Sequence, residues 1–309
     1  MPITGIDAYQ ALRQDAAALD LGSWGVLRLT GSDVREFLQG TATQELTATP
    51  APATPAVAPD RAAQTLFLTE KGRPVALAWV LIEPSGSEAW ILTDSGARQT
   101  LRPHFERFRI MEDVEFEGPD AMPRVIGVAG PERASVLTAL AQKTPGSRAI
   151  PGEPLSFLLA PPETVPLPPC APADAAEAWR LAVGLPHAGV DFDADRIATE
   201  LDLPGAISFT KGCYVGQEVV ARTSNRGQVR RRRVGFRFRW PGTTPPAAKS
   251  EIRAGDAPAG FLTSAAPEPG SAEWLGMGYV LTDSATAGLE LHLIHPDFAT
   301  PISLQPWPL

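Results

Sequence analysis

The chain has 309 residues, of which 44% are hydrophobic and 20% are charged, and its formal net charge is −8 at pH 7. This composition belongs to a globular protein and excludes a disordered or fibrous one, and the length exceeds what one hydrophobic core usually fills. The longest strongly apolar run, residues 75–82, is far shorter than the ~20 residues that a membrane-spanning helix requires, so we expect no membrane partner.

The N-terminal part of the chain predicts a cytoplasmic protein that soon enters a helix. Residues 1–20 contain early acidic side chains and no apolar segment of the secretory type. Residues 30–40 then predict a helix, with Ser32 or Asp33 as its cap and Gly40 at its end.

The next segments alternate between strand and helix patterns. Residues 64–83 predict two strands joined by a turn at residues 70–73. Residues 89–108 predict a strand and then a helix with Asp94 as its N-cap, and residues 124–143 repeat this form. The hairpin, and the lack of a glycine-rich turn of the nucleotide-binding kind, favour an α+β fold with antiparallel sheets over a parallel doubly wound fold.

Two proline-rich stretches, residues 47–59 and 160–172, predict surface loops because proline lacks an N–H group and fixes φ. Cys170 lies in the second loop, far from Cys213, and the two form neither a CxxC pair nor a disulfide framework. Together with only four scattered histidines, this predicts no metal site. Three nearby carboxylates lack the glycine and glutamate of an EF-hand calcium loop: Asp191, Asp193 and Asp195.

After residue 228 the sequence changes to short strands with turns every eight to twelve residues. This spacing predicts a small all-β unit, a barrel or a curled sheet. We therefore expect two regions, residues 1–228 and residues 229–309.

A basic stretch covers this boundary, since residues 219–250 contain no acidic residue and nine cationic ones. Arg233, Arg237 and Arg239 alternate with apolar side chains, which is the period of a half-buried strand with a cationic outer face. We interpret this face as a surface for an anion or a protein partner, and we expect no tight binding of duplex DNA.

Cys213 lies between glycines in the segment KGCYVGQE, residues 211–218. Lys211 precedes it by two residues, and a nearby ammonium group lowers the pKa of a thiol by favouring the reactive thiolate. Gly216 and Gln217 begin a predicted helix whose N–H groups would face an anion or a thiolate. The residues alone leave a second reading open, in which Cys213 is a small buried hydrophobic residue.

The segments that carry a family resemblance are FLQGTATQEL (37–46), LFLTEKGRPVALAWV (66–80), WRLAVGLPHAGVD (179–191), PGAISFTKG (204–212), KGCYVGQEVVAR (211–222), RGQVRRR (226–232), GFLTSAAPEPG (260–270) and LGMGYV (275–280). Together they resemble the folate-binding YgfZ proteins. These are relatives of the T-protein, the aminomethyltransferase of the glycine cleavage system. The resemblance spans nearly the whole chain, and KGCYxGQE is its most specific part because the T-proteins proper lack this cysteine.

The resemblance implies a T-protein-like fold, in which two interleaved α+β domains surround a channel for tetrahydrofolate or a derivative and a C-terminal β-barrel closes it. It also implies an accessory protein that supports the assembly or repair of iron–sulfur proteins, with an indirect effect on tRNA modification. The implied partners are a reduced folate and iron–sulfur assembly proteins or their client enzymes.

The resemblance further implies a site at the rim of the folate channel, with Cys213 as a functional thiol supported by Lys211. The residues expected to contact the cofactor are Gly212, Tyr214, Gly216, Gln217, Glu218, Arg222 and Arg226.

The chain also departs from the aminomethyltransferases. It lacks the expected catalytic aspartate, and the glutamate of their RLEAG-type motif is Ala182. A folate-dependent aminomethyltransferase, or another one-carbon transferase, is therefore the alternative function.

Overall fold

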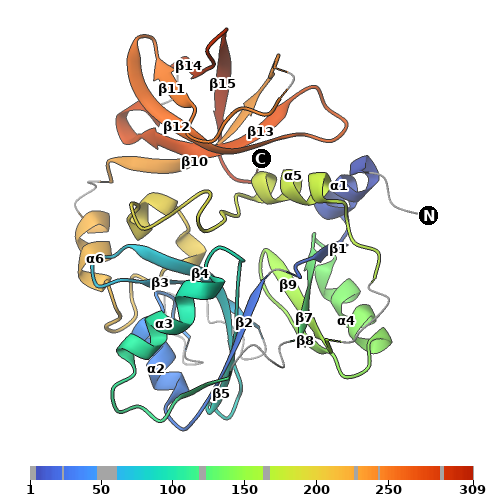
Figure 1. Cartoon of the computed structure of the whole chain (residues 1–309), viewed down its shortest axis with the longest axis vertical. Helices are drawn as coiled ribbons and strands as arrows, with labels where there is room; N and C mark the ends of the chain where they lie inside the picture. The colour runs from blue at the N-terminus through green and yellow to red at the C-terminus, as the bar shows by residue number, and fades with distance from the viewer. Residues whose placement is uncertain are drawn as a thin grey trace.

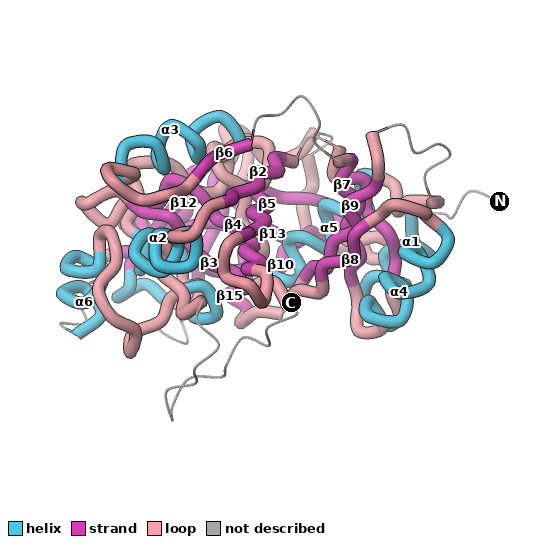
Figure 2. The backbone as a smooth tube through the Cα atoms, turned by 90° about the horizontal axis from the view of Figure 1, so that it is seen from below, coloured by secondary structure: helices cyan, strands magenta, loops and turns pink. Residues whose placement is uncertain are grey.

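The structure is a computed structural model that describes residues 5–22, 24–46, 61–117, 123–162, 168–225, 229–242, 244–285 and 289–308. These residues form two mixed α/β units that lie side by side beneath a β-barrel (Figure 1). Helices α6 (Gln217–Asn225) and α4 (Arg133–Lys143) lie at opposite ends of the molecule, and the C-terminus lies near its middle (Figures 1 and 2).

The first unit is built on an antiparallel sheet in the order β3-β4-β5-β2-β6. Its strands are β2 (Gly25–Thr30), β3 (Ala63–Leu68), β4 (Pro74–Ile82), β5 (Glu88–Thr93) and β6 (Glu115–Glu117). Strands β3 and β4 confirm the predicted hairpin. Helices α2 (Val34–Thr41) and α3 (Arg98–Phe108) belong to this unit, and α3 buries Leu101 and Phe105 in the core.

The second unit is built on an antiparallel sheet in the order β1-β7-β9-β8. Its strands are β1 (Ala17–Asp20), β7 (Arg124–Ala129), β8 (Arg148–Ile150) and β9 (Leu155–Ala160). Helix α4 covers this sheet and packs Leu137 against Ile126 and Leu158. Because β1 precedes the first unit in the chain and pairs with β7, which follows it, the two units are interleaved.

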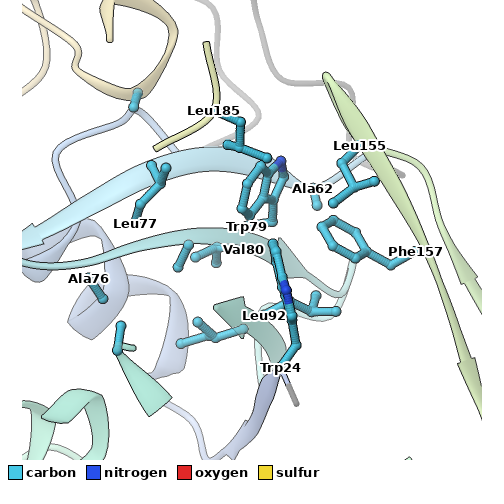
Figure 3. Packing of buried hydrophobic residues seen from close by; sticks show 14 of the residues in the cluster. Trp24, Ala62, Ala76, Leu77, Trp79, Val80, Leu92, Leu155, Phe157 and Leu185 are labelled. Atoms are coloured by element: carbon cyan, nitrogen blue, oxygen red, sulfur yellow. The ribbon is translucent and has the colours of Figure 1, made fainter. Parts of the chain in front are cut away.

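Aromatic side chains join the two sheets. The ring centroids of Trp24, Trp79 and Phe157 lie 5.4 to 5.6 Å apart, in tilted and edge-on arrangements (Figure 3). Trp79 is buried on β4, and its Nε1 donates a 2.9 Å hydrogen bond to the carbonyl oxygen of Glu153. Such ring pairs add to the free energy gained by burying apolar surface, so the two units share one core.

The C-terminal unit is a closed antiparallel barrel in the order β10-β13-β12-β11-β14-β15. Its strands are β10 (Arg231–Phe238), β11 (Glu251–Ala254), β12 (Ala257–Pro267), β13 (Trp274–Leu281), β14 (Leu291–Ile294) and β15 (Ala299–Gln305). The barrel has a core of its own, which includes Phe236, Phe238, Leu262 and Leu293. The predicted C-terminal barrel is confirmed.

Helices α1 (Gly5–Gln14) and α5 (Ala173–Val183) pack together directly beneath the barrel (Figure 1). Helix α5 is capped by Gly184, whose φ is +71°, and a Cβ atom there would lie 2.5 Å from the ring of Trp307. The position therefore requires glycine. Trp307 Nε1 donates a 3.0 Å hydrogen bond to the carbonyl oxygen of Leu181, which holds the C-terminal tail on α5.

The described residues also form short 3₁₀ turns, namely η2 (Ala198–Leu201), η3 (Pro204–Ala206) and η4 (Thr282–Ala285). Within the described ranges, no helix is long and apolar enough to cross a membrane.

The arginine face of β10 lies against the α/β units. Arg233 is 1% exposed, and its Nε and Nη1 donate hydrogen bonds of 2.6 and 2.8 Å to the carbonyl oxygens of Leu201 and Gly184. Arg237 is half-buried and forms an ion pair with Glu268. The strand alternates as predicted, but the expected solvent-facing arginine surface is wrong at Arg233 because neighbouring elements cover that face.

Asp191 is the centre of a buried polar junction between α5 and the barrel. It is 1% exposed, and its carboxylate accepts a 2.6 Å hydrogen bond from Arg180 Nη1 and a 2.9 Å bond from the His187 N–H. Strand β12 adds two hydroxyl donors 2.6 Å away, Thr263 and Ser264. Burial opposes ionisation, but Arg180 and these hydroxyls hold the pKa of Asp191 below its ordinary value.

His104 on α3 makes the stability of the first unit sensitive to acid. Its side chain is buried beside Phe105 and Phe108, and its Nε2 has no hydrogen-bond partner among the described residues. Burial lowers its pKa from 6.5 to about 4. Between these values the unfolded chain binds a proton that the folded chain does not, so stability falls as the pH falls.

We expect the free energy of unfolding to drop by about 2 kcal/mol more in the wild type than in His104→Leu between pH 7 and pH 5. Urea unfolding at each pH measures this difference, and His292→Leu on β14 serves as a control at a less buried histidine. Parallel stability curves for the wild type and His104→Leu would contradict the expectation.

Candidate functional site

Cys213 is exposed on a loop that runs alongside the end of α2. The Val215 N–H donates a 3.1 Å hydrogen bond to the Gly40 carbonyl oxygen, and the Ser208 N–H donates a 2.9 Å bond to that of Thr43. Two segments that are far apart in the sequence, residues 37–46 and 204–222, therefore meet in space. Both belong to the set that carries the family resemblance.

Lys211 fastens this loop to the end of α2. Its side chain is buried, and Nζ donates three hydrogen bonds of 2.8 to 2.9 Å to the carbonyl oxygens of Gln39, Ala42 and Gln44. A cation is favoured at this end of a helix because the last carbonyl groups lack partners within the helix. Burial lowers the pKa of Lys211 to about 8.

These contacts give Lys211 a structural role. Its three ammonium hydrogens are directed at backbone carbonyl groups, so its place in the structure is that of an anchor. The role of Lys211 as a cation that lowers the pKa of the Cys213 thiol stays a prediction.

The residues after Cys213 fix the other side of the loop. Tyr214 is buried, and burial raises its pKa to about 12. Gly216 has a φ of +83°, and a Cβ atom there would lie 2.7 Å from the carbonyl oxygen of Thr69, so only glycine fits. Gln217 Nε2 donates a 3.3 Å hydrogen bond back to the carbonyl oxygen of Gly212.

The loop therefore presents an exposed thiol on a well-anchored backbone. The alternative reading of Cys213 as a buried hydrophobic residue is wrong, since the residue is exposed. Glu218 and Arg222 are exposed on α6, and Arg226 lies outside the described residues. Across the described ranges, no group of three or more His, Cys, Asp or Glu side chains is placed to hold a metal ion.

A cavity of about 960 Å³ lies beside this loop. Its walls come from α1, α5, the start of β3, the turn after β7, the loop before Cys213 and the C-terminal tail. Phe209 and Thr210 line it and directly precede Lys211, so the Cys213 loop leaves from the edge of the cavity. Phe209 is an exposed aromatic residue at this edge.

The residues that line the cavity differ from those predicted to contact the cofactor. Of the predicted residues that the structure describes, these do not line it: Gly212, Tyr214, Gly216, Gln217, Glu218 and Arg222. They build the Cys213 loop and α6 instead. Several residues that do line the cavity lie in the resemblance segments 37–46, 179–191 and 204–212, so those segments are the signal in the sequence that could have found them.

The charged residues among those described that line the cavity are Arg13, Arg61, Arg133 and Glu153. Glu153 Oε1 lies 2.7 Å from Arg61 Nη2 and 2.7 Å from Arg133 Nη2. The hydrogen bond from Arg61, together with Arg133, holds the pKa of Glu153 below its ordinary value. This carboxylate is therefore ionised and paired at neutral pH.

Asp94 holds the loop that leads to Asp191. Its Oδ2 accepts a 2.7 Å hydrogen bond from the Ala188 N–H, and its Oδ1 accepts a 3.0 Å bond from the Ala97 N–H. The predicted N-cap of α3 is wrong, because Ala97 occupies that position and Asp94 lies in the preceding turn. Burial raises the pKa of Asp94.

Comparison with known proteins identifies the family. No family model matches the chain. The human (Homo sapiens) iron–sulfur cluster assembly factor IBA57, a mitochondrial protein, is 30% identical over 249 residues, which cover 72% of this chain and 67% of the human protein. The chain belongs to the family of IBA57 iron–sulfur cluster assembly factors.

Other members of the IBA57 family are longer. The mitochondrial homologue of Chaetomium globosum is 29% identical over 242 residues, and the chain spans 55% of its length. That of Mycosarcoma maydis is 27% identical over 238 residues, and the chain spans 59% of its length. An uncharacterized protein of Haemophilus influenzae is 26% identical over 219 residues, which cover 69% of this chain and 70% of that protein.

The fold of this IBA57-family chain is that of the T-protein. The crystal structure of the glycine cleavage system aminomethyltransferase T from Bartonella henselae matches with a TM-score of 0.78. The match covers 99% of this chain and 90% of that chain at 16% identity, so it bears on the fold alone. The predicted T-protein-like architecture is confirmed.

Proposed function

We propose that this chain supports the assembly or repair of iron–sulfur proteins, with Cys213 as its working thiol and a reduced folate bound in the central cavity. The observation that carries the proposal is the way in which the Cys213 loop is anchored. Buried Lys211 and Tyr214, together with the backbone conformation at Gly216 that requires glycine, fix the loop on both sides while the thiol stays exposed.

An exposed thiol suits this role chemically. Thiolates are the ligands that hold iron–sulfur clusters, and they are also nucleophiles. Because Cys213 is exposed, its sulfur is accessible to a second protein that carries or receives a cluster. The partners we propose are iron–sulfur assembly proteins or their client enzymes. An effect on tRNA modification would follow indirectly, through the iron–sulfur enzymes that carry it out.

The cavity fits a reduced folate. Its volume of about 960 Å³ lies at the upper end of the range for small-molecule sites. Trp179 and Phe209 offer aromatic surface for a ring system, and Arg13 and Arg133 offer cations for carboxylates. A tetrahydrofolate bound there would place a one-carbon carrier beside the Cys213 loop.

The alternative function, a folate-dependent one-carbon transferase, is less well supported by this cavity. Aminomethyl transfer needs a general acid or base near the folate. Glu153 is the one carboxylate among the described lining residues, and it is paired with Arg61 and Arg133. The helix α5 position that matches the T-protein glutamate is the buried Ala182.

The folate part of the proposal is tested by calorimetric titration of the purified chain with tetrahydrofolate and its one-carbon derivatives. We expect saturable binding that weakens as salt is added, because charge pairs at an open cavity are screened. If no reduced folate gives a heat of binding at high protein concentration, the proposal that the chain binds a folate is wrong.

A further inference from the structure

Arg13 is a cation in the cavity wall whose donors are incompletely used. It lies in the last turn of α1, and its Nη1 is buried without a hydrogen-bond partner in the part of the chain that the structure describes. Its guanidinium carbon lies 6.0 Å from the centroid of the Tyr9 ring. A buried charged donor without an acceptor costs free energy, which an incoming anion would recover.

The end of α1 packs on the turn that carries a second cavity arginine. The Glu132 N–H donates a 2.8 Å hydrogen bond to the carbonyl oxygen of Asp15, two residues after Arg13. Arg133 follows directly, and its Nη1 donates a 3.2 Å bond to the carbonyl oxygen of Gly130. Arg13 and Arg133 therefore belong to the same part of the cavity wall.

The charges in this part of the wall do not balance. Among the residues that the structure describes, Arg61 and Arg133 share the carboxylate of Glu153, and Arg13 has no carboxylate partner. Three guanidinium groups against one carboxylate leave two positive charges. Guanidinium groups bind carboxylates through paired, charge-assisted hydrogen bonds, so the wall suits a ligand that ends in two carboxylates.

We propose that this wall binds the dicarboxylate tail of the cavity ligand and that Arg13 is the residue that binds a tail carboxylate directly. The inference rests on the proposed function for the identity of the ligand, since the glutamyl tail of a folate carries two carboxylates. It places the tail away from Arg222, an arginine that the family resemblance implied as a cofactor contact, because Arg222 does not line the cavity.

The test compares three probes by calorimetry: tetrahydrofolate, the tail fragment N-(4-aminobenzoyl)-L-glutamate, and the tail-free 6-methyltetrahydropterin. The variant is Arg13→Gln, and the matched control is Arg124→Gln, a partly exposed arginine on β7 near Asp20. We expect Arg13→Gln to raise the Kd for tetrahydrofolate and for the tail fragment about tenfold or more. A tenfold change corresponds to ~1.4 kcal/mol of binding free energy. Binding of the tail-free pterin should not change, and the control should match the wild type.

Equal affinity of the wild type and Arg13→Gln for the tail fragment would overturn the inference. So would a loss of affinity for the tail-free pterin in Arg13→Gln that equals the loss for the tail fragment. No binding of the tail fragment to the wild type would overturn it as well. Arg13-dependent binding of the fragment without any binding of reduced folates would support the tail site and contradict the folate proposal. If Arg13→Gln does not fold, Arg13→Lys keeps the charge, removes the paired donors and is expected to show the same selective loss.

Discussion

Replacing Cys213 with serine is expected to abolish the support of iron–sulfur enzymes while leaving the protein folded. The side chain is exposed, so the hydroxyl replaces the sulfur in water and the change in stability should stay within about 0.5 kcal/mol. A hydroxyl is a poor ligand for iron in a cluster and a weak nucleophile, so the chemical function should be lost. The measurement is the activity of iron–sulfur enzymes in cells that lack their own family member and express the variant.

Cys170 provides the matched control for Cys213. It is half-buried, its Sγ donates to the carbonyl oxygen of Pro168 at 3.3 Å, and burial raises its pKa. Cys170→Ser should therefore restore the enzymes as well as the wild type does. Full restoration by Cys213→Ser, under oxidative stress as well as in normal growth, would show that the thiol is not the working group.

Asp191→Ala is expected to cause the largest loss of stability, about 3 kcal/mol in the free energy of unfolding. The substitution leaves the buried Arg180 without one of its two carboxylate partners. It also takes the acceptor from the Ser264 hydroxyl, while Thr263 keeps its 3.0 Å hydrogen bond to the carbonyl oxygen of Met277. Removing one member of a buried ion pair typically costs 3 to 5 kcal/mol because the other charge stays buried. Glu177 still binds Arg180 in the variant, which places the expected loss at the lower end of that range.

Urea unfolding of Asp191→Ala measures this loss, and Asp193→Ala is its control. Asp193 lies two residues further along the chain and is exposed, so its substitution should change stability by less than about 0.5 kcal/mol. Equal stability of the Asp191 and Asp193 variants would contradict the junction that we describe between α5 and the barrel.

The parts of the fold that the sequence predicts are those governed by local patterns. The β3-β4 hairpin follows from two β-rich runs around a Gly72-containing turn, and α3 follows from the helical spacing of Leu101 and Phe105. The barrel follows from regularly spaced short strands. The hairpin and helix signals each lie within about 20 residues of chain, and the barrel signal is a repeated local pattern, so no knowledge of distant contacts is needed.

The parts that the sequence does not predict depend on which segments meet in space. The alternation along β10 predicts two faces, but it does not show that α5 and η2 cover the arginine face and bury Arg233. The spacing of Lys211 and Cys213 indicates a cation near a thiol, whereas the fold directs that cation to the end of α2. Arg13 and Arg133 are 120 positions apart, and only the packing of α1 on the turn after β7 reveals them as neighbours.

The measurement that tests the central claim most directly is the activity of iron–sulfur enzymes in cells that lack their own IBA57-family protein and express this chain. An enzyme without a cluster, assayed in the same extracts, corrects for general effects on growth. The account predicts that the wild-type chain restores the iron–sulfur enzymes and leaves the reference enzyme unchanged. Folded chain present at the expected level without any restoration of iron–sulfur enzyme activity would contradict it.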